Sequence, residues 1–368
     1  MKKLLKKLLA MAPMLAMGFV CGILIGGYGL YAEDSGFPGG MLGAVAVLFV
    51  GFILAMYLQI AVHEAGHLVF GRMTGYRFCS YRLGSLMLLK EEGRLRLRRM
   101  TLAGTGGQCL MAPPPWSEDL PVVLYNAGGC VMNVLVSLLC LLIWLPLRTH
   151  WLGALPLVSA LVGVVFALTN GIPMRVGGVD NDGRNIRSLK KDPTARYAFW
   201  QQMKICEAQS KGLRLYQMPE EWFSFPEQRL ENPLVASIAV FACNRLLDQG
   251  RIAETKDAIE LLLNRSTGVP GLYRSLLTGD LLCCCLLTGD PDGAKALVTP
   301  EWERFCKSMK TFPSVLRAQY YRALLLEHDR ERAEKVLAAF ERTAKTYPYP
   351  AEIEGERELL ELARSAAV

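Results

Sequence analysis

The chain has 368 residues, enough for about two domains, and 52% of them are hydrophobic, a high share for an ordinary soluble protein. The net charge of +7 comes mainly from the N-terminus and one loop, which argues against a nucleic-acid-binding surface. The eleven cysteines are odd in number and include the consecutive run 283–285, which excludes a disulfide framework. Free cysteines that behave as small hydrophobic residues in a reducing cytoplasm are expected instead.

Hydrophobic residues are concentrated in the first half of the chain. Segments long and apolar enough to cross a bilayer, which takes roughly 20 helical residues, lie at 8–31, 42–70, 121–147 and 151–173. The first could be a signal peptide, but its apolar run is too long and "GLYAED" is a poor cleavage site. We therefore expect an uncleaved anchor and about four transmembrane helices.

Basic residues set the expected orientation of these spans. Four lysines precede the first span, and eight basic residues lie between positions 72 and 99, whereas "YAEDSGFPGG" is only acidic. Basic loops mark the cytoplasmic side. The N-terminus, the loop 71–120 and the C-terminal half are thus predicted to be cytoplasmic in a multi-pass protein of the cell membrane.

The loop 71–120 contains a predicted β-hairpin. "GSLMLLK" and "RLRLRRM" flank "EEG", and Gly93 suits a turn position that needs positive φ. The second arm alternates Arg and Leu, as a half-exposed strand does. The following "LAGTGGQCLMAPPP" lacks helical periodicity.

From about residue 187 onward the chain is typical of a soluble helical protein. Helices are predicted at 233–248, 251–264, 271–288, 313–328, 330–345 and 350–366. Their pairing through glycine-containing turns resembles tetratricopeptide hairpins, although no repeat of about 34 residues emerges. The fold class is an all-α polytopic membrane protein with a small membrane-associated β-hairpin, followed by a soluble tetratricopeptide-like α-solenoid. The predicted domains are an anchor with a short outer loop at 1–40, a core at 41–190 and a cytoplasmic helical domain at 191–368.

The clearest chemical motif is "HEAGH" at 63–67, near the cytoplasmic end of the second span. Residues at i and i+4 share a helix face, so both imidazoles of His63 and His67 can bind one zinc ion. Glu64 would act as the general base toward water. A chance match is the alternative, but two of the chain's four histidines are here. Ionisable residues inside a span are usually functional.

A catalytic zinc ion needs a third protein ligand. Glu91 and Glu92 are candidates, but the basic residues around them favour a solvated turn. The better candidates are Asp180 and Asp182, which follow the break of the fourth span at 171–173.

Two more features favour a centre at this depth of the membrane. Gly66 disfavours a helix interior by about 1 kcal/mol, which suggests that another element packs closely there. Gly128 and Gly129 of the third span permit such an approach. One turn further, Asn133 is either a helix-packing residue or a side chain that faces the zinc cavity and binds substrate or an oxyanion.

Together these motifs resemble the site-2 protease family of intramembrane zinc metalloproteases over roughly residues 40–190. "HEAGH", "GCVMN" at 129–133, and "NGIP" at 170–173 followed by "DG" at 182–183 match the family pattern in order and spacing. The resemblance implies that His63, His67 and Asp182 bind zinc, that Glu64 is the general base, and that Asn133 and Asn170 assist substrate binding. It also implies that the hairpin at 84–100 adds an unwound substrate strand to its edge.

This chain departs from the family pattern at three points. Asn181 stands where the family has Leu, Cys130 stands where Pro is often found, and no PDZ-like segment is present. The expected function is an intramembrane zinc endopeptidase that cleaves a transmembrane or membrane-proximal bond of a membrane protein. The alternatives are an inactive scaffold with structural zinc and, less favoured, a transporter. The expected partners are a membrane-protein substrate, a cytoplasmic adaptor on the C-terminal helices and the lipid bilayer, without nucleic acid.

Overall fold

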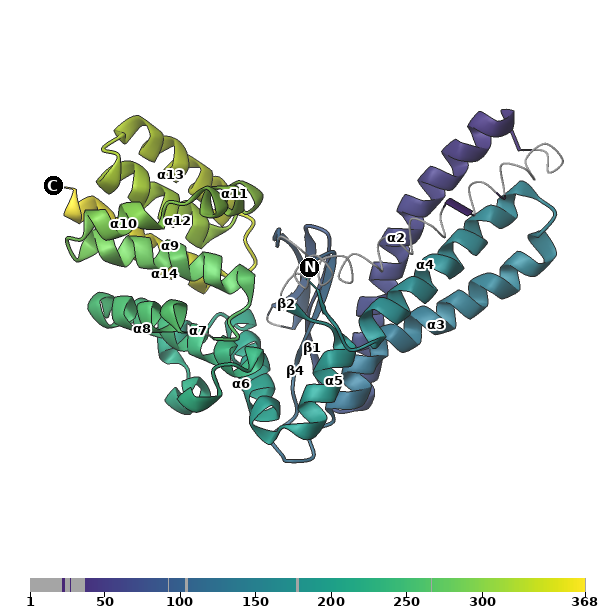
Figure 1. Ribbon diagram of the computed structural model, residues 1–368, viewed down its shortest axis with the longest axis horizontal. Coiled ribbons are helices and arrows are strands. Elements are labelled where there is room, and N and C mark those ends of the chain that lie inside the picture. Colours follow the sequence, from purple (N-terminus) through teal and green to yellow (C-terminus); the bar gives the residue numbers. More distant parts are fainter. Residues whose placement is uncertain are drawn as a thin grey trace, which may run out of the picture. The chain divides into compact units, whose positions relative to one another are not determined.

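A computed structural model describes residues 22–23, 27 and 37–367 of the chain, except for 92, 103, 104, 177, 178 and 266. The predicted first span at 8–31 falls almost entirely outside the described residues. The chain is mostly helical, at 71%, with a small antiparallel sheet (Figure 1). It divides into two compact units, one made of residues 1–75 and 121–190 and the other of 76–120 and 191–368.

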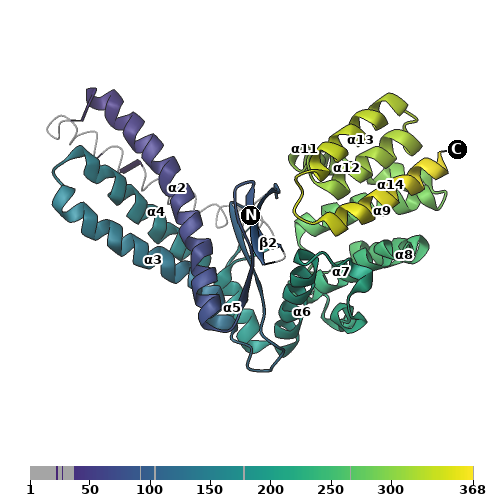
Figure 2. The same ribbon diagram turned by 180° about the vertical axis from the view of Figure 1, so that it is seen from behind.

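The first unit is built on three helices that are long and apolar enough to cross a membrane. They are α2 (Gly40–Met73), α3 (Val122–Leu147) and α4 (Ala154–Gly171), and a 3-10 turn, Trp151–Gly153, directly precedes α4. They run side by side in both ribbon views (Figures 1 and 2). The helices predicted at 42–70, 121–147 and 151–173 are therefore present.

These helices have buried faces that contact one another and exposed faces that are also apolar. Ala44, Leu48 and Val158 pack in the interior between α2 and α4. By contrast, Leu42 of α2 is 82% exposed and Leu142 of α3 is 63% exposed. Contiguous apolar surface of this kind is unfavourable in water and favours contact with lipid.

A short segment with two strands follows α4, the predicted fourth span. Strands β5 (Arg175–Val176) and β6 (Val179–Asp180) form a two-stranded antiparallel sheet, and helix α5 (Asp182–Lys191) follows directly. The chain then enters the second unit at α6 (Pro193–Ser210).

The second unit contains a four-stranded antiparallel sheet in the order β3-β2-β1-β4. Its strands are β1 (Arg77–Leu83), β2 (Leu86–Glu91), β3 (Arg94–Arg99) and β4 (Gly107–Ala112). The predicted hairpin is present as β2 and β3, with Leu86 opposite Arg99 and with Gly93 at φ +80° in the turn. The structure differs from the predicted isolated hairpin, because β1 and β4 extend the hairpin into a four-stranded sheet.

The sheet belongs to the C-terminal helices, unlike the predicted core at 41–190. Arg77 of β1 forms an ion pair with Glu207 of α6, with 3.1 Å between Nη2 and Oε1. At the β3 edge of the sheet, the amide nitrogen of Arg99 donates to the carbonyl oxygen of Thr346 at 3.1 Å. Residues 76–120 thus pack with 191–368, while the predicted boundary near residue 190 coincides with the division between units.

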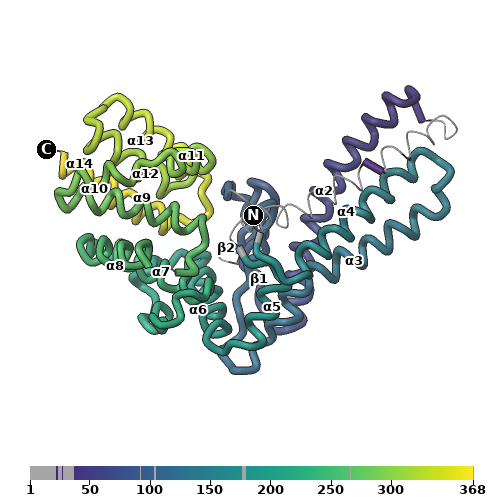
Figure 3. The backbone as a smooth tube through the Cα atoms, in the orientation of Figure 1, coloured from purple at the N-terminus to yellow at the C-terminus, as the bar shows by residue number. Residues whose placement is uncertain are grey.

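The remaining chain forms paired helices (Figure 3). They are α7 (Pro233–Asp248), α8 (Ile252–Asn264), α9 (Gly271–Leu287), α10 (Pro291–Leu297), α11 (Pro300–Ser308), α12 (Pro313–Tyr321), α13 (Arg330–Ala344) and α14 (Pro350–Ala366). Short 3-10 turns cover Leu215–Gln217, Glu220–Phe223 and Glu227–Arg229, and a π-helical turn, Arg322–Leu326, ends α12. The six predicted helices are present, but α5, α6 and α11 were not predicted.

Several of these helices begin with the same local device. Asp192, Asn232 and Asp290 accept hydrogen bonds from backbone amides of the first turn, and each precedes a proline. The side chain satisfies amides that the helix leaves unpaired, and proline needs no such partner at the first position. The largest core of these helices contains Tyr321, Phe340, Cys283 and Cys285, and Cys284 is buried in a smaller cluster with Leu247 and Leu359. The ten described cysteines are free, as predicted.

Candidate metal centre

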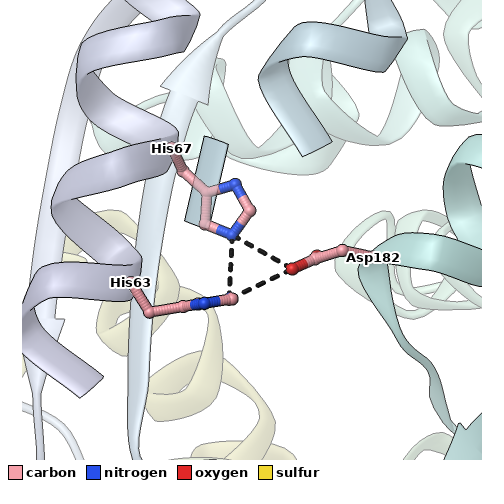
Figure 4. Close-up of side chains that lie close together, drawn as sticks. All are labelled: His63, His67 and Asp182. Carbon is pink, nitrogen blue, oxygen red and sulfur yellow. Dashed lines mark hydrogen bonds and ion pairs between the residues drawn. The ribbon is translucent and has the colours of Figure 1, made fainter. Parts of the chain in front are cut away.

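Three potential ligand atoms converge in the first unit (Figure 4). Nε2 of His63 and Nε2 of His67, one helical turn apart on α2, are 3.3 Å from each other. Oδ2 of Asp182, at the start of α5, is 3.1 Å from Nε2 of His63 and 3.5 Å from Nε2 of His67. Both histidines are 8% exposed, so the centre is largely shielded.

The second nitrogen of each ring fixes its tautomer. Nδ1 of His67 lies 2.9 Å from the carbonyl oxygen of Tyr125, which can only accept a hydrogen bond. Nδ1 of His63 lies 2.8 Å from Oδ1 of Asn133. Both Nδ1 atoms therefore carry the proton, and in the neutral rings both Nε2 atoms carry a lone pair.

This arrangement fits a metal ion. Two lone pairs and a carboxylate oxygen facing one another repel unless a positive charge, either a metal ion or a proton, lies among them. Oδ2 of Asp182 is buried and has no hydrogen-bond partner of good geometry among the described residues. Ligand atoms at about 2.0–2.1 Å from a tetrahedral zinc ion are about 3.3–3.4 Å apart. The three observed separations, 3.1, 3.3 and 3.5 Å, lie around that value.

A buried amide network supports His63 from behind. Nδ2 of Asn133 donates to the backbone oxygen of Gln59 at 2.9 Å and to its side-chain Oε1 at 2.8 Å. Nε2 of Gln59 donates in turn to the carbonyl oxygen of Ser159 on α4 at 3.0 Å. Because both end acceptors are backbone carbonyls, the orientation of both amides is fixed, and Oδ1 of Asn133 must face His63.

Glycines bring the helices close enough for these contacts. A Cβ atom on Gly66 would lie 2.2 Å from the carbonyl oxygen of Gly128, so α2 and α3 touch through their backbones. A Cβ atom on Gly129 would lie 2.5 to 2.6 Å from atoms of the His63 ring. The close approach predicted at Gly66, Gly128 and Gly129 is present, and it sets the position of His63.

Asn181 holds the segment that presents Asp182. Its Nδ2 donates to the carbonyl oxygens of Thr169 at 2.7 Å and Ile172 at 2.6 Å, which are unpaired at the end of α4. Its Oδ1 accepts from the amides of Met174 and Arg184, both at 3.0 Å. Asn181 thus forms four hydrogen bonds that hold the chain between the end of α4 and the start of α5.

The other candidate ligands lie elsewhere. Asp180 forms ion pairs with Arg175 at 2.7 Å and Arg184 at 3.0 Å. Glu91 pairs with Arg98 at 3.0 Å, as its basic surroundings indicated, and Glu92 lies outside the described residues. Among the described candidates, Asp182 is the carboxylate that joins the two histidines.

The remaining predicted site residues differ in their surroundings. Glu64 follows His63 on α2, is half-buried and interacts electrostatically with His67. Asn133 is fully buried, and its contacts orient His63, a role different from the predicted binding of substrate. Asn170 donates from Nδ2 to the carbonyl oxygen of Phe166 in the preceding turn, at 3.0 Å. Substrate binding by Asn133 and Asn170 stays a prediction.

Comparison of the chain with protein-family models, with curated proteins and with solved structures finds no match in any of the three.

Proposed function

We propose that this protein is an intramembrane zinc metallopeptidase that cleaves a transmembrane or membrane-proximal peptide bond of a membrane protein. One observation carries the proposal: two imidazoles from a helix long enough and apolar enough to cross a membrane converge with one carboxylate from the start of α5. Two imidazole nitrogens and one carboxylate oxygen form a ligand set that suits zinc. The resemblance of the motifs to the site-2 protease family agrees with this proposal.

His63, His67 and Asp182 would hold the ion through Nε2, Nε2 and Oδ2. When bound, zinc supplies Lewis acidity that activates water and polarises a peptide carbonyl. Glu64 is adjacent to the first ligand and is outside the ligand set. It would accept the proton from the attacking water and pass it to the leaving amine. Three protein ligands rather than four favour an open, catalytic site over a closed, structural one.

The orientation in the membrane is part of the proposal. The basic residues between positions 72 and 99 favour a cytoplasmic location for the second unit and for the adjacent ends of α2 and α3. His63 and His67 lie in the last third of α2, toward that end. Water and substrate would then reach the centre from the cytoplasmic side.

The second unit would handle the substrate or an adaptor. Strand β3 is an edge strand of the four-stranded sheet, and its residues are mostly exposed. An exposed edge can accept an extended peptide as an additional strand. The paired helices α7 to α14 are proposed to form a tetratricopeptide-like solenoid that binds partners.

The proposal is tested in cells that carry either the wild-type protein or Glu64→Gln. Comparative membrane proteomics should show a membrane protein that accumulates uncut with Glu64→Gln and is cleaved with the wild type. A matched control is Glu118→Gln, a change of an exposed glutamate in the second unit. Unchanged processing of all membrane proteins in Glu64→Gln cells would instead support the scaffold alternative.

A further inference from the structure

The second unit contains a cavity of about 290 Å³ that none of the metal-centre residues line. It lies among α6, α7, α9, α12, α14 and β4. Half-buried rings of Phe241, Tyr273, Phe312 and Tyr349 form much of its apolar wall. Its volume is at the lower end of ligand cavities, which are about 300–1,000 Å³, so it suits one long side chain better than a large cofactor.

The charges on the cavity wall do not balance. Two guanidinium groups face four carboxyl groups, Asp248, Asp280, Glu352 and Glu356. Arg317 is 1% exposed and pairs with both Asp280 and Glu356 at 2.6 Å. Arg214 pairs with Asp248 at 2.7 Å and, outside the cavity wall, with Glu358 at 2.6 Å. Each arginine is therefore already shared between two carboxylates.

Glu352 is the carboxyl group left without a cation. Its hydrogen-bond partner is the hydroxyl of Tyr347, 3.1 Å from Oε1, and no Lys or Arg among the described residues forms an ion pair with it. Burial raises the pKa of Glu352 to about 8, and the charges of Glu356 and Asp248 contribute to the rise. Burial and the neighbouring negative charges favour the protonated form of Glu352, and the hydrogen bond from Tyr347 only partly opposes them.

A second unsatisfied group lines the same cavity. Nη1 of Arg317 is buried and has no hydrogen-bond acceptor among the described residues. A buried donor without an acceptor is destabilising. The cavity thus lacks one cation, opposite Glu352, and one neutral acceptor, opposite Arg317. The excess of negative charge would repel a carboxylate ligand. A peptide carbonyl carries no net charge and would not be repelled in this way.

We propose that this cavity binds a lysine or arginine side chain of a peptide segment. The charged end would pair with Glu352, the aliphatic stem would lie against the aromatic rings, and a main-chain carbonyl would accept from Nη1 of Arg317. Segments next to the cytoplasmic ends of transmembrane helices are rich in lysine and arginine. The cavity would therefore recognise the basic flank of a membrane protein, and this inference stands independently of the metal centre.

The test uses the full-length protein in detergent and the capped peptide acetyl-Ala-Leu-Lys-Leu-Ala-amide, with the same peptide carrying norleucine in place of lysine as the reference. The lysine peptide should bind at least tenfold more tightly. Glu352→Gln preserves the size of the side chain and a hydrogen bond with Tyr347. The variant should nevertheless bind the two peptides with equal affinity. Glu354→Gln changes an exposed glutamate of the same helix outside the cavity and should retain it.

The pH dependence in the wild-type protein gives a readout that does not depend on a variant folding. The lysine side chain pairs with the ionised form of Glu352, so below about pH 8 the Glu352 carboxyl must first lose its proton. The affinity for the lysine peptide should therefore rise up to tenfold per pH unit between pH 6 and about 8 and then level off. Burial raises the pKa of the nearby Cys206 thiol to about 12 and that of Tyr347 well above its usual range. Burial also raises the pKa of Glu356, but Arg317 opposes that rise.

Each result of these binding experiments either supports or contradicts the proposal. Preference for lysine that rises with pH and is lost in Glu352→Gln supports the proposal. Equal affinity for the two peptides, or a lysine preference that survives in Glu352→Gln, overturns it. Butylammonium chloride that competes as strongly as the peptide, at equal concentration, would contradict the part of the proposal that concerns the peptide carbonyl.

Discussion

Asn133 Oδ1 accepts a hydrogen bond from His63 Nδ1 at 2.8 Å, and this contact joins helix α3 to helix α2 next to the candidate metal centre. The amide of Asn133 is itself fixed by Gln59, which is fixed by Ser159 of α4. A polar chain that crosses three apolar helices thus determines which nitrogen of His63 faces Asp182. Such supporting contacts orient metal ligands and tune their affinity.

The first prediction concerns Gln59, which is fully buried. Gln59→Leu removes the side-chain acceptor of the Asn133 amide and leaves only the backbone oxygen of residue 59, so His63 is held less firmly in one tautomer and orientation. We expect zinc affinity about 10–100-fold below that of the wild type. A competition titration with a chromophoric chelator on the purified protein measures this change.

A suitable control for Gln59→Leu is Ser137→Ala. Ser137 is buried on α3, and its hydroxyl has no hydrogen-bond partner among the described residues. The substitution therefore removes a buried polar group from the same helices without removing a hydrogen bond of the network. Zinc affinity should stay at the wild-type value in the control, and an equal affinity in Gln59→Leu would contradict the role of the network.

The second prediction concerns Gly129. Alanine normally favours a helix over glycine by about 1 kcal/mol. Here a Cβ atom would lie 2.5 to 2.6 Å from the His63 ring, so Gly129→Ala should displace the ring and lower zinc affinity at least tenfold. Gly171→Ala is the matched control, because its nearest neighbour would be Cys130 Sγ at 3.6 Å. Similar zinc affinities in the two variants would refute this packing argument.

The third prediction separates the two aspartates near the end of α4. Asp182→Ala should lose zinc, because its carboxylate completes the ligand set. Asp180→Ala should keep the ion, because that carboxylate pairs with Arg175 and Arg184 instead. Metal analysis after gel filtration distinguishes them, and the reverse result would assign the third ligand to Asp180.

The fourth prediction concerns the attachment of the sheet to α6. Glu207 is 2% exposed, and its carboxylate contacts Lys204, Lys211 and Arg77. Burial alone would raise the pKa of Glu207, but hydrogen bonds from the two lysines lower it to about 2. A depressed pKa contributes stability that is present above about pH 5 and is lost as the pH falls toward 2.

Glu207→Gln should therefore lower the free energy of unfolding by about 2 kcal/mol at pH 7 and weaken the acid dependence of stability. Thermal unfolding of the full chain between pH 3 and pH 7 measures both effects. Glu254→Gln, in an exposed pair with Arg251, should leave the unfolding temperature unchanged. Identical acid profiles for Glu207→Gln and the wild type would count against this account.

The sequence predicts local features well because they depend on nearby residues. The i, i+4 spacing places His63 and His67 on one face. Asn232 and Pro233 mark the start of α7, and Pro350 marks the start of α14. The involvement of Asp182 rather than Asp180 could be favoured but not decided, since both follow the same break in the chain.

Features that depend on distant residues could not be predicted in this way. Gln59 is one polar residue in an apolar helix, and only its contacts with α3 and α4 reveal its role. Strand β1, "RFCSYRL", lacks clean alternation and is defined by its pairing with β2 and β4. The grouping of 76–120 with the C-terminal helices likewise follows from long-range contacts such as Arg77 with Glu207.

The most direct test of the central claim is the zinc content of the purified full-length protein, measured by metal analysis for the wild type, Glu64→Gln and His67→Ala. The account predicts about one zinc ion per chain in the wild type and in Glu64→Gln, because Glu64 is outside the ligand set, and almost none in His67→Ala. Zinc retained in full by His67→Ala, or absent from a wild-type protein supplied with zinc, would contradict it.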